Sequence, residues 1–146
     1  MIALLDMLGD MERGFLERAR VAHLATADAG GQPHVVPVCF GLLAMTAYVQ
    51  IDEKPKGDPR RLKRLRNLLE NPLAALLVDR YDDADWSRLG WVMLRGRTEI
   101  LEAGAELQAA QTLLRGRYPQ LAAMNLTGLP AIALRIERVA RWGKLD

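Results

Sequence analysis

The chain contains a single cysteine, Cys39. One cysteine excludes an intrachain disulfide, and it excludes the zinc and iron–sulfur sites that need several thiolates. Such low cysteine content suits a reducing compartment, so we expect the protein to be cytoplasmic. The N-terminal residues also lack the basic start and uninterrupted apolar run of a signal peptide, because Asp6, Asp10 and Glu12 interrupt them. Export is therefore not expected.

Long apolar runs are missing too. Nowhere do about 18 apolar residues follow one another without a charge, which excludes a transmembrane helix and predicts no membrane partner. Glycine-rich phosphate loops, nucleophile elbows and motifs with paired carboxylates are also absent from the sequence. Hydrolytic chemistry is therefore not expected, and no catalytic side chain can be named.

The few residues that could bind a metal or act as a nucleophile are better explained by packing. His23 and His34 lie on neighbouring predicted strands without a third ligand at a metal-like spacing, which favours strand packing or surface positions. Cys39 stands between Val38 and Phe40 with no cation beside it, so a buried, inert thiol is favoured over a nucleophile. We predict no metal site.

Hydrophobic periodicity predicts one mainly β domain that spans residues 1–146. Leu4, Leu8, Met11 and Phe15 recur at helical spacing and predict an opening helix that ends near Arg20. Two further helices are predicted over residues 58–70 and 105–117, and six strands over residues 21–26, 34–40, 48–52, 73–78, 91–101 and 131–142. Residues 42–47 are either a turn or a strand extension. Because hairpins dominate and helices are few, we expect an antiparallel barrel with helices packed outside it.

Two of the predicted strands differ in their expected burial. Residues 73–78 are an unbroken apolar run, which is typical of a strand covered on both sides. Residues 91–101 alternate instead, with Val92 and Leu94 on one face and Arg95 and Arg97 on the other. That alternation predicts a half-exposed strand.

Positive charge is concentrated in residues 54–66. This segment holds seven of the 20 lysines and arginines and only one of the 18 acids, so it carries +6 and the rest of the chain, with a total of +2, carries −4. On the predicted helix, three cations and an amide share one face, and three leucines share the opposite face. The first set is Arg60, Lys63, Arg64 and Asn67, and the second is Leu62, Leu65 and Leu69. A solvated helix face is one interpretation. The other is a site for a small anion, which Lys54 and Lys56 at a strand exit would close from a second side.

Two further features bear on partners. Nucleic acid is not expected, because the remainder of the chain is acidic and the basic helix lacks interleaved aromatic residues.

The polar loop before residue 91 holds Trp86 and leads to Trp91. Core packing of these rings, a dimer seam and a wall against a flat cofactor all remain open for this loop.

Several segments, taken in order, resemble the pyridoxamine-phosphate-oxidase-like proteins. These segments are Val21-Ala22-His23-Leu24-Ala25-Thr26, Gly31-Gln32-Pro33-His34-Val35-Val36-Pro37-Val38, Lys54-Pro55-Lys56 with the basic helix after it, Asn71-Pro72, and Asp85-Trp86-Ser87-Arg88. The resemblance covers residues 12–143. It is strongest to the branch of probable deazaflavin (coenzyme F-420) dependent enzymes.

The resemblance implies an antiparallel split β-barrel of the FMN-binding-protein kind, which forms a homodimer with two cofactor sites in the subunit interface. The flat ring would lie along the strand of Val36, Pro37 and Val38. The family's Ser-Arg-Lys phosphate-binding triplet falls on Leu62-Lys63-Arg64, where the serine is missing. The predicted cofactor-binding side chains are therefore the remaining cations and the loop tryptophan: Lys54, Lys56, Arg60, Arg61, Arg64 and Trp86.

The resemblance further implies an oxidoreductase that transfers a hydride between coenzyme F-420 and an unidentified small organic substrate. Seven cations exceed what the single phosphate of FMN requires, which favours the multiply charged deazaflavin cofactor over FMN. Two alternatives stay open: an FMN-dependent oxidoreductase of the same fold, and a carrier that binds the cofactor without turnover. A homodimer also follows from packing, because side chains fill a small barrel and leave the ring only a groove that a partner closes.

Overall fold

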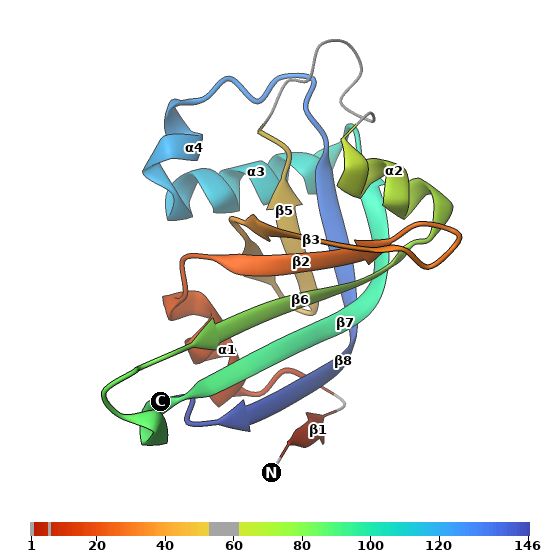
Figure 1. The fold of residues 1–146 in the computed structure, drawn as a ribbon. Coiled ribbons are helices and arrows are strands. Elements are labelled where there is room, and N and C mark those ends of the chain that lie inside the picture. Colours follow the sequence, from red (N-terminus) through yellow and green to blue (C-terminus); the bar gives the residue numbers. More distant parts are fainter. Residues whose placement is uncertain (1, 6, 53–61) are drawn as a thin grey trace.

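The protein forms one curved antiparallel sheet with helices packed against it (Figure 1). The computed structural model describes residues 2–5, 7–52 and 62–146, and side chains from residue 7 onward within these ranges. Eight strands pair in the order β3-β2-β6-β7-β8-β5-β4, with β1 added to the side of β8. Their bounds are β1 Ala3–Leu5, β2 Ala22–Ala27, β3 Pro33–Val38, β4 Gly41–Leu43, β5 Thr46–Gln50, β6 Leu73–Arg80, β7 Gly90–Leu101 and β8 Ala131–Gly143.

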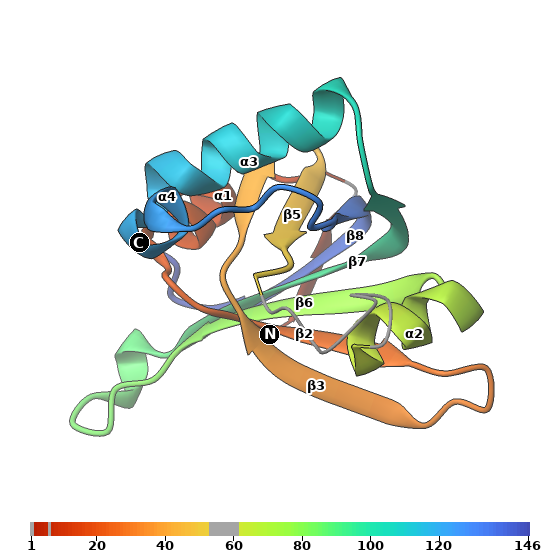
Figure 2. The same ribbon diagram turned by 90° about the horizontal axis from the view of Figure 1, so that it is seen from above.

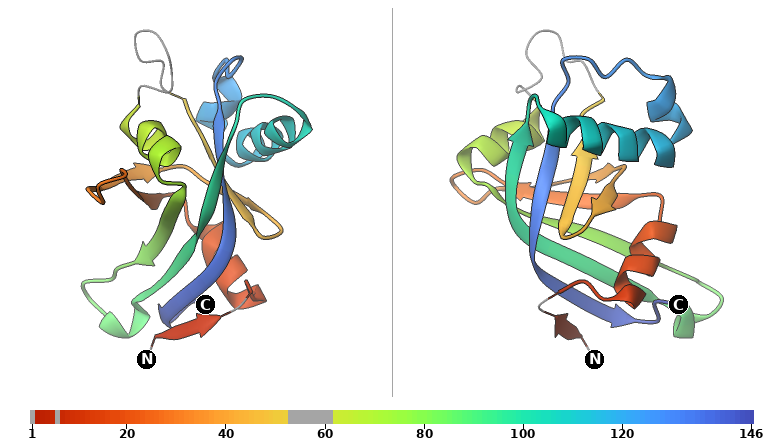
Figure 3. Two further views of the ribbon diagram at one scale, coloured as in Figure 1. Left: turned by 90° about the vertical axis from the view of Figure 1, so that its right-hand side faces the viewer. Right: turned by 180° about the vertical axis from the view of Figure 1, so that it is seen from behind.

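Four α-helices accompany the sheet: α1 Asp10–Arg18, α2 Lys63–Glu70, α3 Ala105–Arg117 and α4 Pro119–Ala123. In Figure 1 the strands β2, β6 and β7 face the viewer, and the view from behind in Figure 3 brings α1, α3 and α4 to the front. Helix α1 packs into the core on the concave face, whereas α3 and α4 pack against Tyr48 and Ala133, which point to the opposite, outer face of β5 and β8. The mainly β, antiparallel character predicted from the sequence is confirmed. Among the described residues, β3 and β4 are the edges of the sheet, and no hydrogen bonds pair them to close it into a barrel.

The hydrophobic core fills the concave side of this sheet. Leu24, Leu76 and Leu94 from three neighbouring strands are each at most 1% exposed, and Leu16 of α1 is fully buried among them. Figure 2, which looks along the sheet from above, shows how far the strands curl around this space. A smaller cluster, with Tyr48 and Ala133 from the sheet and Leu114 from α3, joins α3 to the sheet.

The end of α3 is tied to the end of α1 by one arginine. Arg117 donates hydrogen bonds to the carbonyl oxygens of Leu16, Glu17 and Ala19 at the C-terminal end of α1, where backbone carbonyls need partners from outside the helix. Its Nε also donates to the carbonyl of Phe40 at 2.8 Å. Arg117 therefore fixes α1, α3 and the link between β3 and β4 relative to one another.

The N-terminal prediction is wrong in its first half. Residues 3–5 form strand β1, which pairs with Val139–Arg141 of β8, and the helix begins only at Asp10. Met11, expected on the buried face, is 51% exposed, whereas Glu12 is buried and accepts a hydrogen bond from Arg141 at 2.7 Å. Strand pairing with a segment more than 130 residues away cannot be read from local spacing.

Strand β6 is covered on one face only, so the prediction of burial on both sides is wrong for this chain. Ala74, Leu76 and Val78 are buried, while Leu73 is 52% exposed and the residues between are partly exposed. The sequence is apolar on both faces all the same. The chain therefore leaves an apolar outer face of β6 in contact with water.

Helix α2 begins later and is turned differently from the prediction. The structure shows it from Lys63, after a non-helical Leu62, and the predicted start at Asp58 lies outside the described residues. Asn67, expected on the outer face, is fully buried because its Nδ2 donates to Thr26 Oγ1 at 3.0 Å, and Leu69 is 62% exposed. This bond to β2 rotates the helix so that Arg64 is only partly exposed.

The remaining strand and helix predictions agree with the structure. Helix α3 has the predicted bounds, and the alternation of β7 places Val92, Leu94 and Thr98 inside. The open question over residues 42–47 resolves into strand β4, a tight turn with Ala44 at φ 51°, and the start of β5. No helix among the described residues is long and apolar enough to cross a membrane.

Candidate functional site

A cavity of about 370 Å³ opens between β3, β5 and α2. It lies where the two strands diverge, because β3 pairs only with β2 and β5 pairs with β4 and β8. Most of its wall is aliphatic, and it also contains a thiol, an amide, a carboxylate and a guanidinium. The lining residues are Val21, Val36, Pro37, Val38, Cys39, Val49, Gln50, Asp52, Arg64 and Leu121.

Arg64 brings a positive charge to this wall. Its Nε is buried and has no hydrogen-bond partner among the described residues. A buried guanidinium nitrogen without an acceptor costs free energy, so an acceptor supplied by a ligand would stabilise the site. Guanidinium groups also bind phosphate and carboxylate oxygens in a fixed fork geometry.

Gln50 supplies an unused acceptor to the same wall. This side chain is only 6% exposed, and its Nε2 donates to the carbonyl oxygens of Ile51, Leu129 and Pro130 at 2.9, 3.4 and 3.1 Å. These three acceptors fix the orientation of the amide and leave Oε1 without a donor among the described residues. Sequence reasoning missed Gln50, although a polar residue inside the apolar run Tyr48-Val49-Gln50-Ile51 is a signal that could have identified it.

Cys39 lies at the mouth of the cavity and is exposed, so the prediction of a buried thiol is wrong. The chain leaves β3 at Val38 and turns toward β4, and this turn directs position 39 outward while Phe40 enters the core. Desolvation by its surroundings, with a smaller contribution from the Asp52 carboxylate, raises the pKa of the Cys39 thiol. Cys39 is therefore a protonated thiol near neutral pH, which agrees with the expected lack of nucleophilic activation.

The structure brings together four of the predicted cofactor-binding residues. Val36, Pro37 and Val38 line the cavity from β3, and Arg64 lines it from α2. Four others, Lys54, Lys56, Arg60 and Arg61, lie outside the described residues.

Trp86 is separate from this group. It lies in the short 3-10 turn Trp86–Arg88 between β6 and β7, is 69% exposed, and does not line the cavity.

A second cavity of about 560 Å³ lies on the outer face of the sheet. Small side chains such as Ala25 and Ala75 form much of its floor, and Arg95 and Arg138 stand at its side. It shares no lining residue with the first cavity. In the described part of the chain, no group of three metal-ligating side chains gathers at either cavity or elsewhere.

Comparison with known proteins identifies the family. The family model described as pyridoxamine 5'-phosphate oxidase matches residues 8–143 of this chain. The chain belongs to this family. The matched range contains all the residues that line the first cavity.

Proteins similar to this chain have diverse names. A 5a,11a-dehydrotetracycline/5a,11a-dehydrooxytetracycline reductase of Streptomyces rimosus is 26% identical over 129 residues, which cover 88% of this chain and 78% of the reductase. Among solved structures, a heme binding protein of Mycobacterium smegmatis superposes with a TM-score of 0.74 at 23% identity, and a FAD-binding protein of Mesorhizobium loti with a TM-score of 0.66 at 23% identity. The alignments cover 92% and 97% of this chain.

The two structural neighbours differ in size. The chain spans 53% of the M. smegmatis protein and 97% of the M. loti protein. At these identities the structural matches establish the fold alone.

Proposed function

We propose that this protein is an oxidoreductase that binds coenzyme F-420, a deazaflavin, in the cavity between β3, β5 and α2 and serves hydride transfer to or from a small organic substrate. The observation that carries the proposal is that one cavity unites Val36, Pro37 and Val38 with Arg64, whose buried Nε has no partner in the described part of the chain. An apolar slot with a cation at one side suits a flat ring that carries an anionic tail. Family membership and the reductase relative support the same class of chemistry.

The residues of the site would bind and orient the cofactor. The strand backbone at residues 36–38 and the aliphatic side chains of Val49 and Leu121 would contact the ring and exclude water. Arg64 would hold an anionic group, together with the cations of residues 54–61 that the sequence analysis assigns to phosphate binding. The deazaflavin itself supplies the hydride chemistry when bound, so the chain needs to provide binding and orientation rather than an acid or base.

FMN is the alternative cofactor for the same site. A second candidate function is a carrier that binds the cofactor without turnover, and one observation favours it. Apart from Arg64, the titratable side chains in the described wall are Cys39 and Asp52. The thiol is held in its protonated form by its raised pKa. Cys39 and Asp52 are thus the described groups of the wall that could exchange a proton with a substrate, and so small a set is compatible with storage or transfer of the cofactor.

The protein is further proposed to act as a homodimer. The outer side of β2, β3 and β6 leaves apolar side chains in water, with Val35 64% and Leu73 52% exposed. Exposed apolar faces of this kind mark interaction sites. A small-molecule substrate, and neither nucleic acid nor membrane, remains the expected further partner.

Absorbance and turnover test the proposal. Protein purified from its native host should carry a single deazaflavin band rather than the two-band spectrum of a flavin. Reduced cofactor should then be oxidised in the presence of the protein and candidate acceptors such as quinones or tetrapyrroles. Tight binding without oxidation above background would leave the carrier, and failure to bind either F-420 or FMN would exclude both functions.

A further inference from the structure

The outer face of the sheet holds the second cavity, of about 560 Å³, which the proposed cofactor site does not use. Its volume lies within the range of roughly 300–1,000 Å³ that is typical of small-molecule sites. Five adjacent strands, β3, β2, β6, β7 and β8, contribute residues to its wall. The cavity is therefore built on the rigid sheet and not on a loop.

The floor of this cavity is a depression between longer side chains. One row of direct cross-strand partners crosses the five strands: Val35, Ala25, Ala75, Arg95 and Arg138. Neighbours in such a row have Cβ atoms roughly 4.5–5.5 Å apart, so the two short alanines leave the row low between the valine and the arginines. Their methyl groups form an apolar surface on which a flat apolar group can lie.

Positive charge is concentrated on one side of the depression. Arg95 and Arg138 are exposed and stand directly opposite each other on β7 and β8. In the described part of the chain, neither forms an ion pair of 4.0 Å or less. Against these two cations the described wall sets one carboxylate, Glu137, and so it stays positive. Like charges directly opposite each other destabilise a sheet, and a bound anion would remove that cost.

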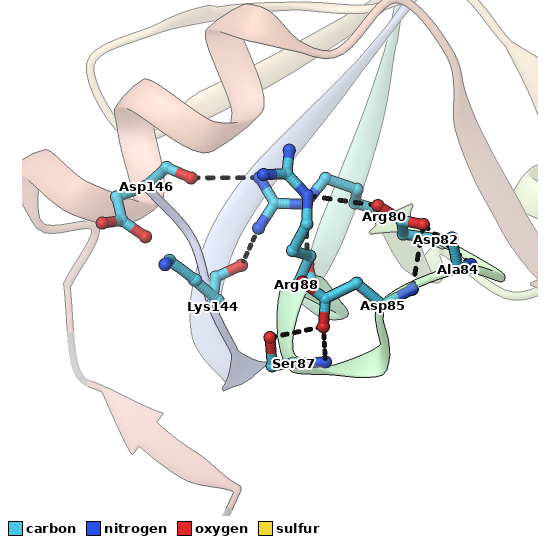
Figure 4. A network of polar contacts seen from close by, with 8 residues as sticks. All are labelled: Arg80, Asp82, Ala84, Asp85, Ser87, Arg88, Lys144 and Asp146. Carbon is cyan, nitrogen blue, oxygen red and sulfur yellow. Dashed lines mark hydrogen bonds and ion pairs between the residues drawn. The ribbon is translucent and has the colours of Figure 1, made fainter.

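Arginines at the other end of the β6–β7 ribbon have partners within the chain. Arg80 donates to the carbonyl oxygens of Arg88, Lys144 and Asp146 at 2.8, 2.7 and 3.1 Å (Figure 4). Arg88 pairs with Asp82 at 3.2 Å. The chain thus satisfies these guanidinium groups itself, whereas its described residues offer no ion-pair partner to the two arginines at the cavity.

A β-bulge lies in the wall beside the arginines. The register of β7 and β8 shifts between Arg95 and Gly96, and Gly96 pairs with Ile136, so Glu137 has no direct partner. Gly96 and Glu137 both line the cavity. Bulges redirect neighbouring side chains and are over-represented next to active sites. The bulge therefore helps to set the position of the arginine pair relative to the alanine floor.

We infer that this cavity binds a small organic anion, with its phosphate or carboxylate group between Arg95 and Arg138 and its apolar body on Ala25 and Ala75. Two guanidinium groups on neighbouring strands can bind the oxygens of one such group from two sides. The alanine floor removes apolar surface of the ligand from water, which favours an anion with an apolar body over an inorganic one. The inference goes beyond the proposed function, since the two cavities share no lining residue.

Three probes test the two halves of the site on the wild type: phenyl phosphate, inorganic phosphate and phenol. Titration calorimetry at constant ionic strength measures their affinities. We expect phenyl phosphate to bind at least tenfold more tightly than the other two, because it alone combines the anionic group with the apolar body. Equal affinities of phenyl phosphate and inorganic phosphate would overturn the inference. This comparison does not depend on the folding of any variant.

Arg95→Gln and Arg138→Gln should each weaken the binding of phenyl phosphate by about 10- to 100-fold, because each removes one charge-assisted hydrogen bond. Arg97→Gln is the matched control. It removes the same charge from an exposed position of the same strand, and Arg97 does not line the cavity, so the affinity should be unchanged. Ala75→Leu keeps both arginines and fills the floor, and it should reduce the affinity for phenyl phosphate to that for inorganic phosphate.

Arg64→Ala separates this cavity from the cofactor cavity, whose guanidinium group also attracts phosphate. Loss of phenyl phosphate binding in Arg64→Ala, with binding kept in Arg95→Gln and Arg138→Gln, would overturn the inference. A wild type that binds no phenyl phosphate would overturn it too, including the case in which the partner of the proposed homodimer closes the cavity. Sedimentation at the same concentrations checks that the variants keep the oligomeric state of the wild type. None of these results bears on the proposal of F-420, which absorbance and turnover test separately.

Discussion

Gly96 of β7 lies directly against the carbonyl oxygen of Arg135 in β8. A Cβ placed on Gly96 would stand 1.8 Å from that oxygen, and the strand register shifts between Arg95 and Gly96. The bulge at this point leaves Glu137 without a direct partner and brings the two backbones closer than any side chain permits. Glycine is therefore required here by space, since its backbone angles are ordinary.

Gly96→Ala should destabilise the fold by roughly 1–3 kcal/mol, because two backbone segments must move apart to admit the methyl group. The matched control is Gly116→Ala in α3, where a new Cβ would meet nothing within 4 Å. That change should stabilise the protein by roughly 0.5–1 kcal/mol through helix propensity. Urea unfolding of the three proteins measures both effects. Equal stability of the wild type and Gly96→Ala would show that the bulge can relax.

Arg64→Ala should weaken cofactor binding by about 10- to 100-fold, which corresponds to the roughly 1.5–3 kcal/mol of one hydrogen bond to a charged group. The thermal stability of the protein without cofactor should change little. Arg66→Ala is the matched control, since it removes the same charge from an exposed position of the same helix. Titration at two salt concentrations separates a specific contact from the general field of the basic segment. Identical affinities of the two variants would remove Arg64 from the site.

Bound cofactor should protect Cys39 from alkylation. The thiol is exposed at the cavity mouth and is the only one in the sequence, so the extent of labelling reports a single position. Because the thiolate is the reactive form and the pKa of Cys39 is raised, the labelling rate of the free protein should still be rising above pH 9. Mass spectrometry of samples with and without cofactor measures the protection. Equal labelling in both would place the ligand elsewhere.

Acid should weaken the attachment of α3 to the sheet through Glu106. Hydrogen bonds from Arg135 and Tyr48 lower the pKa of Glu106 to about 2. A carboxyl whose pKa is lower in the folded state contributes stability above its ordinary pKa, and this contribution is lost as the pH falls toward 2. The stability gap between the wild type and Glu106→Gln should therefore be widest above pH 5 and close between pH 4.5 and 2. Glu102→Gln, which removes an exposed carboxylate just before the same helix, should show no such closing in urea unfolding at the same pH values.

The sequence allows some of these features to be foreseen and hides others for physical reasons. The bounds of α3 and the two faces of β7 follow from local periodicity, because each element packs against one surface. The rotation of α2 depends on the bond from Asn67 to Thr26, a residue 41 positions away. Helical spacing alone could not reveal it.

The sequence predicts some residues of the candidate site and misses others. Strand residues 36–38 and Arg64 were predicted through the resemblance to the family, and the structure brings them to one cavity. Gln50 stands out in the sequence as a polar residue in an apolar run, but the orientation of its amide depends on the distant Leu129 and Pro130 carbonyls. The cavity mouth at Cys39 depends on how the chain turns after β3. Both features depend on contacts between residues far apart in the sequence, which local sequence patterns do not reveal.

Strand β8 is the last element of the chain, yet it pairs with β7, β5 and β1. During synthesis the edges of β5 and β7 stay unpaired until residues 131–143 have emerged, so the sheet cannot be completed before then. A protein truncated before Ala131 should fail to fold and aggregate. A chaperone that shields β5 and β7 during this interval would raise the yield of native protein more than one acting on the finished chain.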